Sequence, residues 1–203
     1  MEDGAYTDSI IHRSVSNFIF QGGGYTFNGA ELETIPGKTP VINEPVFSNV
    51  KGTIAMAKLG GNPNSATTEW FFNVNNNSAN LDVQNGGFTA FGQVVAGDIA
   101  VMEAIAGIQK CNAGGAFSEI PLTDFDCNGN ITAGAENFIT VYQIVIVDSS
   151  SATAQNLTPV KNTLINQPEP TTPSDDSSGG SMFWGLIALL STLVFRTKLT
   201  RSH

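Results

Sequence analysis

The chain has 203 residues, a net charge of −9 and a hydrophobic content of 41%, which suffices for one globular core of ordinary size. The negative charge lies in residues 1–147, where five Lys or Arg stand against fourteen Asp or Glu. This acidity argues against nucleic acid as a partner, because phosphate binding requires a basic face. Such a charge balance is typical of a solubilising surface.

Two stretches in the first half of the chain alternate apolar and polar residues, as strands do. The first comprises residues 11–13 and 17–24, and the second comprises residues 52–57 and 66–74. Arg13, Gln21 and Glu69 each stand among large apolar side chains, which is typical of an apolar groove with a few fixed donors and acceptors. Clusters of Gly, Asn, Pro and Ser separate these runs, so we predict an antiparallel β domain with long loops up to Val147.

One segment breaks this strand pattern. Apolar residues at 99, 101, 102 and 105 predict a short amphipathic helix over 98–106. Asp98 would be its N-cap, and Gly107 stands just past its end. The apolar run over 139–147 is then expected to form a last buried strand.

The order and spacing of these motifs, from about Tyr6 to Val147, resemble the cyclophilin family of peptidyl-prolyl isomerases, specifically its bacterial members. The resemblance implies a mainly β fold, an antiparallel β-barrel capped by a short helix. The strand pair and helix that precede the matching segment in cyclophilins are missing, and residues 1–6 lack the basic and then apolar pattern of a signal peptide. We therefore expect an N-terminally truncated sequence whose isomerase domain covers residues 1–148.

Isomerisation of an X-Pro bond is slow because the partial double bond of the amide sets a barrier of about 18–20 kcal/mol. The reaction needs no nucleophile, metal or cofactor, only surroundings that favour the twisted amide. The resemblance makes Arg13 the catalytic arginine, with its guanidinium aimed at the lone pair that the twisted proline nitrogen regains. His12 would point to the opposite face of the strand and is interpreted as structural.

The resemblance also implies the other members of the site. Gln21 corresponds to the glutamine that hydrogen-bonds the substrate backbone and helps to orient the arginine. Residues around the proline ring would be Phe18, Ile19, Phe71 and Leu81, and residues along the substrate's main chain would be Ala57 and Lys58. We expect Arg13, Phe18 and Gln21 to carry the catalytic step.

Three positions depart from the family pattern. Glu69 replaces the usual glutamine, which keeps an acceptor but loses the amide donor; it could hold Arg13 or compete with the substrate for it. Phe88 stands where many members carry a pocket histidine. Asn80 replaces the bulky aromatic residue of drug-sensitive relatives, which predicts weak cyclosporin binding.

Cys111 and Cys127 are the only cysteines and lie sixteen residues apart with no histidine nearby. Two thiols alone make a poor zinc site, so the pair is either a disulfide, if the chain is exported, or two unpaired thiols.

Asp124, Asp126 and Asn128 resemble the first half of a calcium loop, but no acid stands at its closing position. The alternative is an Asn- and Gly-rich turn, and we predict no metal site.

The composition changes after the β domain. Residues 149–178 are dominated by Ser, Thr, Pro, Asn and Gln and are expected to form a disordered linker. Within the last segment, 179–203, Gly179 and Gly180 precede an apolar run over 182–195, and basic residues follow it. As a transmembrane-like helix this run would span about 21 Å, short of a bilayer core of about 30 Å, with its basic end in the cytoplasm.

This order resembles the bacterial GlyGly-type C-terminal sorting tail, which a rhomboid-like protease removes; a permanent membrane anchor is the alternative. We therefore expect an exported peptidyl-prolyl cis-trans isomerase of the cell envelope or surface. It would act as a monomer on proline-containing polypeptides during their folding. A cyclophilin-like peptide-binding module without significant turnover is the alternative function. A third hypothesis, a calcium-stabilised surface adhesion module, rests on residues 124–136 and on the tail.

Overall fold

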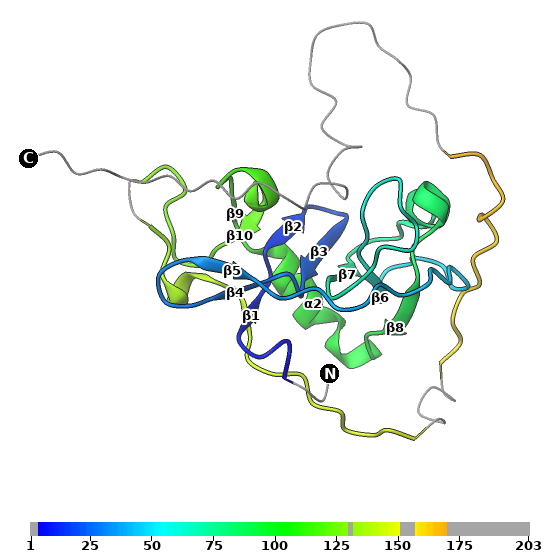
Figure 1. Ribbon diagram of the computed structural model, residues 1–203, viewed down its shortest axis with the longest axis horizontal. Helices are drawn as coiled ribbons and strands as arrows, with labels where there is room; N and C mark the ends of the chain where they lie inside the picture. The colour runs from blue at the N-terminus through cyan, green and yellow to red at the C-terminus, as the bar shows by residue number, and fades with distance from the viewer. Residues whose placement is uncertain (1–3, 130–131, 151–156, 170–203) are drawn as a thin grey trace, which may run out of the picture.

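The computed structural model describes residues 4–129, 132–150 and 157–169, and this part of the chain is mainly β with long connections (Figure 1). The strands are β1 (Ser9–Ile10), β2 (Arg13–Val15), β3 (Ile19–Gly22), β4 (Tyr25–Phe27), β5 (Leu32–Thr34), β6 (Thr53–Met56), β7 (Trp70–Asn73), β8 (Ala90–Gln93), β9 (Lys110–Cys111), β10 (Ile120–Pro121) and β11 (Thr140–Val141). The helical segments are α1 (Ser78–Leu81), α2 (Ile99–Gly107) and the 3-10 turns η1 (Gln84–Gly86), η2 (Ala96–Asp98), η3 (Gly115–Phe117) and η4 (Ala135–Asn137).

The strands pair in antiparallel sheets that remain open. A five-stranded sheet has the order β2-β3-β7-β6-β8, a four-stranded sheet has the order β11-β1-β4-β5, and β9 pairs with β10. The expectation of a closed barrel is wrong for the described residues. Closure requires a continuous ladder of strand pairs, and the ladder of the larger sheet ends at β2 on one side and at β8 on the other.

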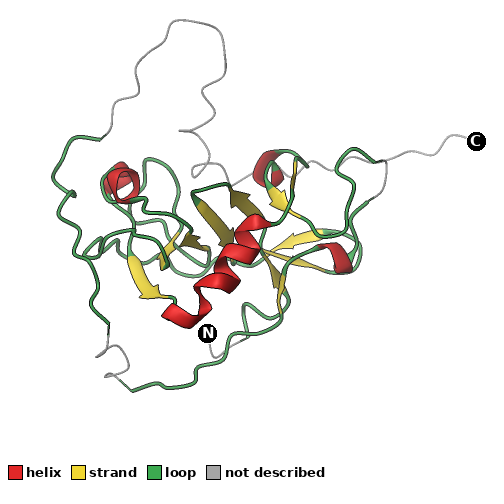
Figure 2. Cartoon of the chain, turned by 180° about the vertical axis from the view of Figure 1, so that it is seen from behind, coloured by secondary structure: helices red, strands yellow, loops and turns green. Residues whose placement is uncertain are grey.

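One face of the five-stranded sheet is covered by α2, which lies across it in Figure 2. Phe20 and Trp70 point to this face and pack with Met102 of the helix. The predicted short helix is confirmed, with Asp98 at its N-cap position, although the Asp98 side chain makes no capping hydrogen bond. Gly107 is the last helical residue and not the residue after the helix.

The opposite face of the same sheet carries a second apolar cluster. Ile19 of β3 and Phe71 of β7 pack there with Leu81, the last residue of α1. The separation follows from the alternation of side chains along a strand, which sends neighbouring residues to opposite faces. The aromatic run of β7 is thereby divided, because Trp70 faces α2 and Phe71 faces α1.

An apolar groove of about 570 Å³ remains open beside α2. Its walls include Val101, which is 61% exposed, and Phe91 of β8, which is 46% exposed.

The expected buried strand over 139–147 is also wrong, because only β11 pairs, with β1, and Val147 is 95% exposed. No described strand continues the ladder on the free edge of β11, so the residues after it stay uncovered.

Residues 157–169 lie against the domain, at the orange edge of Figure 1. Lys161 forms an isolated antiparallel bridge with Phe47, so this part of the expected disordered linker is bound to the domain. The free backbone groups of residues 46–48 provide the pairing edge, which composition alone does not reveal. Residues 170–203 lie outside the described ranges, and with them the predicted sorting tail and its apolar helix.

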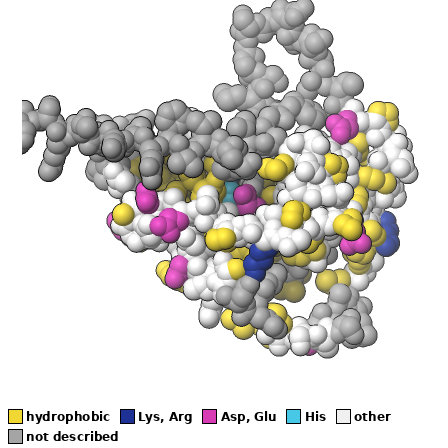
Figure 3. Space-filling view, in the orientation of Figure 1, with side chains coloured by type: hydrophobic (Ala, Val, Ile, Leu, Met, Phe, Trp, Pro, Cys, Tyr) yellow, Lys and Arg dark blue, Asp and Glu magenta, His cyan; other side chains and the backbone are white. Residues whose placement is uncertain are grey.

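The described helices are all too short or too polar to cross a bilayer. The face seen in Figure 3 mixes hydrophobic and uncharged polar side chains, with scattered acidic side chains and few basic ones.

Candidate active site

A row of side chains crosses four neighbouring strands on the face that is turned away from α2. Arg13 of β2 lies opposite Gln21 of β3, Gln21 lies opposite Phe71 of β7, and Phe71 lies opposite Ala55 of β6. Directly opposite residues of antiparallel strands share a face, with Cβ atoms about 4.5–5.5 Å apart. The sheet register therefore carries a cation and an amide to the edge of an apolar cluster, as the sequence analysis expected of these residues.

Arg13 is buried and has one carboxylate partner among the described residues. Its Nη2 lies 3.4 Å from Oε2 of Glu119, which immediately precedes β10. The main chain fixes this approach, because the backbone N–H of Ser14 donates to the Glu119 carbonyl oxygen at 2.8 Å. Burial lowers the pKa of Arg13, and the charge and hydrogen bond of Glu119 oppose that shift. Nε and Nη1 of Arg13 are buried without a hydrogen-bond partner among the described residues.

Glu69 is bound to Gln21 and not to Arg13. Nε2 of Gln21 donates to Oε2 of Glu69 at 2.6 Å, and Nε2 of His12 lies 3.4 Å from the same oxygen. Burial acts to raise the pKa of Glu69, but the hydrogen bond and charge of His12 and the hydrogen bond from Gln21 together lower it. Since a carboxylate only accepts hydrogen bonds, the Gln21 amide must turn its nitrogen toward Glu69.

His12 lies beside the site, where it shares a Glu69 carboxylate oxygen with Gln21, and its interpretation as a structural residue stays a prediction. It is 1% exposed and meets Tyr25 edge-on, with the ring centroids 4.9 Å apart. Burial, followed by the nearby charge of Glu69, raises the pKa of Tyr25 to about 12. The contact between His12 and Tyr25 joins the segment just before β2 of the five-stranded sheet to β4 of the four-stranded sheet.

The residues expected around the proline ring form one apolar cluster. Phe71 and Phe88 meet edge-to-face, with ring centroids 5.6 Å apart and planes at 75°, a favoured aromatic arrangement. Phe18 packs on the cluster and is only half-buried. The cluster contains Ile19, Ala55, Ala57, Phe71, Leu81, Phe88 and Ala90. All five residues predicted for the ring pocket and its wall are thus brought together, and their roles stay predictions.

The side chain of Lys58 is buried, and the pairing of the Ala57 and Lys58 backbone with a substrate stays a prediction. The Lys58 backbone follows Ala57, whose N–H donates to the Glu69 carbonyl oxygen at 2.9 Å. Its side chain turns inward, where Nζ donates to the carbonyl oxygens of Asn85, at 2.8 Å, and Gly87. Nζ also lies 4.6 Å from the ring centroid of Phe88. Burial lowers the pKa of Lys58 to about 8. This ammonium therefore joins the segment after β6 to the loop after α1.

A buried amide network, which was not predicted from the sequence, supports the site. Nδ2 of Asn77 donates to the Phe18 carbonyl oxygen at 2.9 Å, and Nδ2 of Asn49 donates to the Phe88 carbonyl oxygen at 3.0 Å. The backbone N–H of Asn49 also donates to Oδ1 of Asp82 at 2.7 Å. The signal was the richness in asparagine of a segment interpreted only as a loop. Glu119 was missed as well, because nothing in its local sequence relates it to Arg13.

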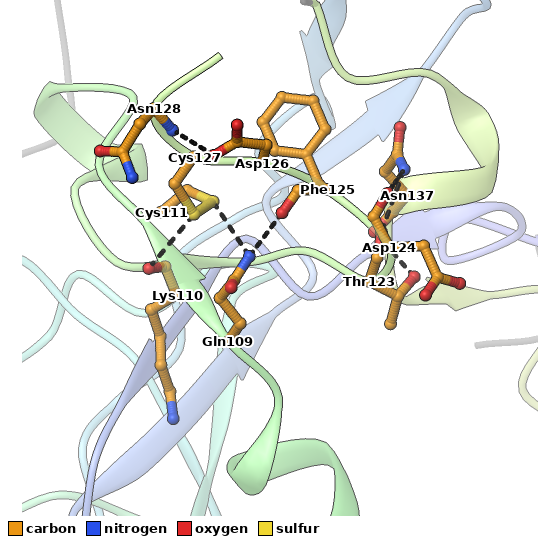
Figure 4. Close-up of a disulfide and its surroundings, with 10 residues drawn as sticks. All are labelled: Gln109, Lys110, Cys111, Thr123, Asp124, Phe125, Asp126, Cys127, Asn128 and Asn137. Carbon is orange, nitrogen blue, oxygen red and sulfur yellow. Dashed lines mark hydrogen bonds between the residues drawn. A yellow bond between two sulfur atoms is a disulfide. The ribbon is translucent and has the colours of Figure 1, made fainter.

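Figure 4 shows the disulfide that joins Cys111 to Cys127, with a Cα–Cα distance of 5.2 Å. Beside it, Nε2 of Gln109 donates to the Phe125 carbonyl oxygen at 2.7 Å. Within the calcium-like pattern, the side chain of Asp126 stabilises a turn, because its Oδ1 accepts the backbone N–H of Asn128 at 3.0 Å. The described residues contain no group of three or more His, Cys, Asp or Glu side chains that could hold a metal.

Residues 1–125 match the family described as cyclophilin type peptidyl-prolyl cis-trans isomerase/CLD. This match covers more than half of the chain, so the chain belongs to the cyclophilin-type peptidyl-prolyl cis-trans isomerase family. The mainly β fold with a short helix is that of the family.

Bacterial relatives of the chain are named peptidyl-prolyl cis-trans isomerases. The chain is 38% identical over 112 residues to a peptidyl-prolyl cis-trans isomerase of Acinetobacter baylyi, covering 54% of this chain and 57% of the relative. It is 32% identical over 128 residues to peptidyl-prolyl cis-trans isomerase B of Escherichia coli, covering 60% of this chain and 74% of that protein. A crystal structure of a Cryptosporidium parvum cyclophilin type isomerase, in the presence of the dipeptide Ala-Pro, has a TM-score of 0.48 at 20% identity over 72% of this chain and 79% of that one.

Proposed function

We propose that this chain accelerates the cis-trans isomerisation of X-Pro bonds in polypeptides. The observation that carries the proposal is the cross-strand row, which sets the Arg13 guanidinium beside the apolar cluster around Phe71. Two of its nitrogens are buried and have no hydrogen-bond partner among the residues that the structure describes. A proline ring fits the apolar side, and a free N–H of the guanidinium suits the lone pair of a twisted proline nitrogen. A reduction of the barrier by about 7 kcal/mol would accelerate isomerisation roughly 10⁵-fold.

The neighbouring residues position this cation. Glu119 holds one nitrogen of Arg13 from the side. Gln21 is held by Glu69 and keeps its amide oxygen available for a donor, because its nitrogen is already committed to the carboxylate. The substrate's backbone or Arg13 itself can use that oxygen. The step involves rotation about one bond, so no group on the protein needs to gain or lose a proton.

The alternative is a peptide-binding module without significant turnover, and Glu69 is the observation that favours it. The glutamate replaces a donor with a charge at the centre of the site, where it can draw polar groups away from the transition state. A protease-coupled assay on the full-length chain with an Ala-Pro peptide separates the two functions. Acceleration of the cis-to-trans step supports the isomerase. Saturable peptide binding with an unaccelerated step supports the binding module.

We propose further that the protein acts outside the cytoplasm as a monomer and is delivered there with its C-terminal tail. The support is the order of Gly179-Gly180, the apolar run over 182–195 and the basic end, together with a disulfide that suits an oxidising compartment. Mass spectrometry of the mature protein from the native host should find an end before Met182. An intact peptide spanning 195–203 would mean that the tail is a permanent anchor.

We also propose that an N-terminal strand pair and helix belong to the complete protein and cover the open groove beside α2. The groove is apolar, and the chain spans 57% of the Acinetobacter relative's length. A version extended by the upstream coding sequence should melt at a higher temperature and bind less of a hydrophobic dye than residues 1–203. Equal melting and equal dye binding would reject this placement. Dimerisation of the present chain through the groove would appear in sedimentation.

A further inference from the structure

The loop that follows α1 connects two residues of the apolar cluster around Phe71, hereafter the ring-pocket cluster. It begins after Leu81, runs through residues 82–87, and ends at Phe88. Leu81 and Phe88 are each buried and are joined by one hydrogen bond, from the Phe88 N–H to the Leu81 carbonyl oxygen at 2.9 Å. The position of this pocket loop, residues 82–87, therefore determines whether both side chains reach the cluster.

The domain itself holds the pocket loop on one side. Nζ of Lys58 donates to the carbonyl oxygens of Asn85 and Gly87. Nδ2 of Asn43 donates to the carbonyl oxygens of Gly86, at 2.7 Å, and Gly87, at 2.9 Å. Gly87 has a φ of +70°, and a Cβ atom there would meet the Asp82 carbonyl oxygen at 2.8 Å, so the loop is tightly folded.

Residues 157–169, hereafter the strap, approach from outside as an extended segment that pairs with residues 46–48. The backbone N–H of Ser48 donates to the Val160 carbonyl oxygen at 2.8 Å, and the N–H of Asn162 donates to the Val46 carbonyl oxygen at 3.0 Å. Between them, Nζ of Lys161 lies 4.5 Å from the ring centroid of Phe47. Phe47 in turn packs against the ring-pocket cluster. The strap is thus fixed to residues 46–48 by main-chain hydrogen bonds.

Side chains of the strap then reach the pocket loop at its start and in its middle. Nδ2 of Asn162 donates to the Asp82 carbonyl oxygen at 2.9 Å. Oε1 of Glu169 accepts the backbone N–H of Asn85 at 2.8 Å. Between these bonds, a Cβ placed on Gly87 would lie only 3.0 Å from Cδ1 of Ile165. The strap therefore covers backbone groups of the loop that the domain leaves free.

We infer that the strap is a working part of the catalytic domain, which holds the pocket loop from its outer side and so keeps the proline pocket in its binding form. The functional domain then extends to residue 169 and does not end at 148. Its members act through Leu81 and Phe88 and are positioning residues. This inference rests on the proposed function for its kinetic test but not for its structural test.

The kinetic test uses Asn162→Ala in the full-length chain. If the loop leaves its place part of the time, the apparent affinity falls by the fraction of competent molecules, while bound substrate still meets an intact Arg13. Asn162→Ala removes the bond to the Asp82 carbonyl oxygen and the bond that Oδ1 of Asn162 accepts from the Leu164 N–H. Each lost bond shifts such an equilibrium by a factor of about three to ten, so KM should rise, by at most the combined factor, with kcat changed less than twofold. The matched control is Asn166→Ala, an exposed asparagine of the same segment, which should change neither.

The structural test is hydrogen exchange of the backbone amides of Asn85 and Phe88. Both should exchange faster by the same factor in Asn162→Ala and in Glu169→Ala, and not in Asn166→Ala. Unchanged exchange and unchanged KM in both variants would overturn the inference. Equal falls of kcat and melting temperature with unchanged exchange would show a purely structural strap and would overturn it as well. If the parent chain shows no turnover, the proposed function fails, and the exchange measurement alone decides on the strap.

Discussion

The two faces of the five-stranded sheet are built from the same strands and do different work. The face toward α2 is apolar, with Phe20, Trp70 and Met102 in one cluster. The opposite face sets Arg13 and Gln21 beside the ring-pocket cluster, and two guanidinium nitrogens are buried there with no hydrogen-bond partner in the described part of the chain. An unsatisfied buried donor costs about 1–3 kcal/mol. The first face stabilises the fold. The second face lowers the stability of the fold, because its polar groups are arranged for a site and are not fully hydrogen-bonded.

The largest effect should come from breaking the stabilising face. Trp70→Ala removes a side chain that is 7% exposed, and such truncations cost about 3–5 kcal/mol of unfolding free energy. Activity should fall only as far as the folded fraction falls at the assay temperature. Denaturant unfolding measures this effect, and Val95→Ala, at a position that is 59% exposed, is the control. A loss below about 1 kcal/mol would contradict the assignment of this face.

Breaking the disulfide should have the next largest effect. The bond between Cys111 and Cys127 closes a loop with a separation of 16 residues, which corresponds to about 3 kcal/mol of stabilisation. This loop contains Glu119, so the double Cys→Ser variant should also lower kcat modestly by loosening the partner of Arg13. The unfolding midpoint of the parent should fall on reduction, and that of the variant should not respond. An equal response of both would refute the pairing.

A smaller effect is expected at the centre of the site. Glu69→Gln should keep or raise kcat/KM, by no more than a few fold, because it restores the amide donor that the family usually has. The substitution frees the Gln21 amide from its fixed orientation. The same protease-coupled assay measures the change. A clear loss of activity would mean that the carboxylate orients Gln21 usefully.

The smallest effect concerns Lys58 at the rim of the site. Burial lowers its pKa from 10.5 to about 8, so between these two values the unfolded chain binds more protons than the folded chain. The unfolding free energy should therefore rise with pH across this window and level off above it. Lys58→Met should flatten the rise. A parent whose unfolding free energy falls steadily across the window would show that the buried ammonium is stabilised and not penalised.

Local patterns predicted the elements and failed at long-range contacts. The alternation around Arg13 and Phe71 and the helical spacing before Gly107 are properties of a few consecutive residues, and both were expected correctly as strand and helix. The Arg13–Glu119 pair spans 106 positions, and the strap pairs with residues 46–48, more than a hundred residues earlier in the chain. No periodicity signals such contacts. The open sheets were not predicted, because the expectation of a closed barrel was taken from the resemblance to the family.

The central claim is that Arg13 performs the catalytic step and does not hold the fold together. The most direct test measures kcat/KM and unfolding free energy together for Arg13→Ala, with Lys51→Ala, an exposed lysine paired with Glu103, as the control. We predict that kcat/KM falls 100-fold or more, which is about 2.7 kcal/mol or more, while the protein stays folded, because the Glu119 carboxylate left behind is 33% exposed and remains in contact with water. Near-normal turnover in a folded Arg13→Ala protein would contradict the account.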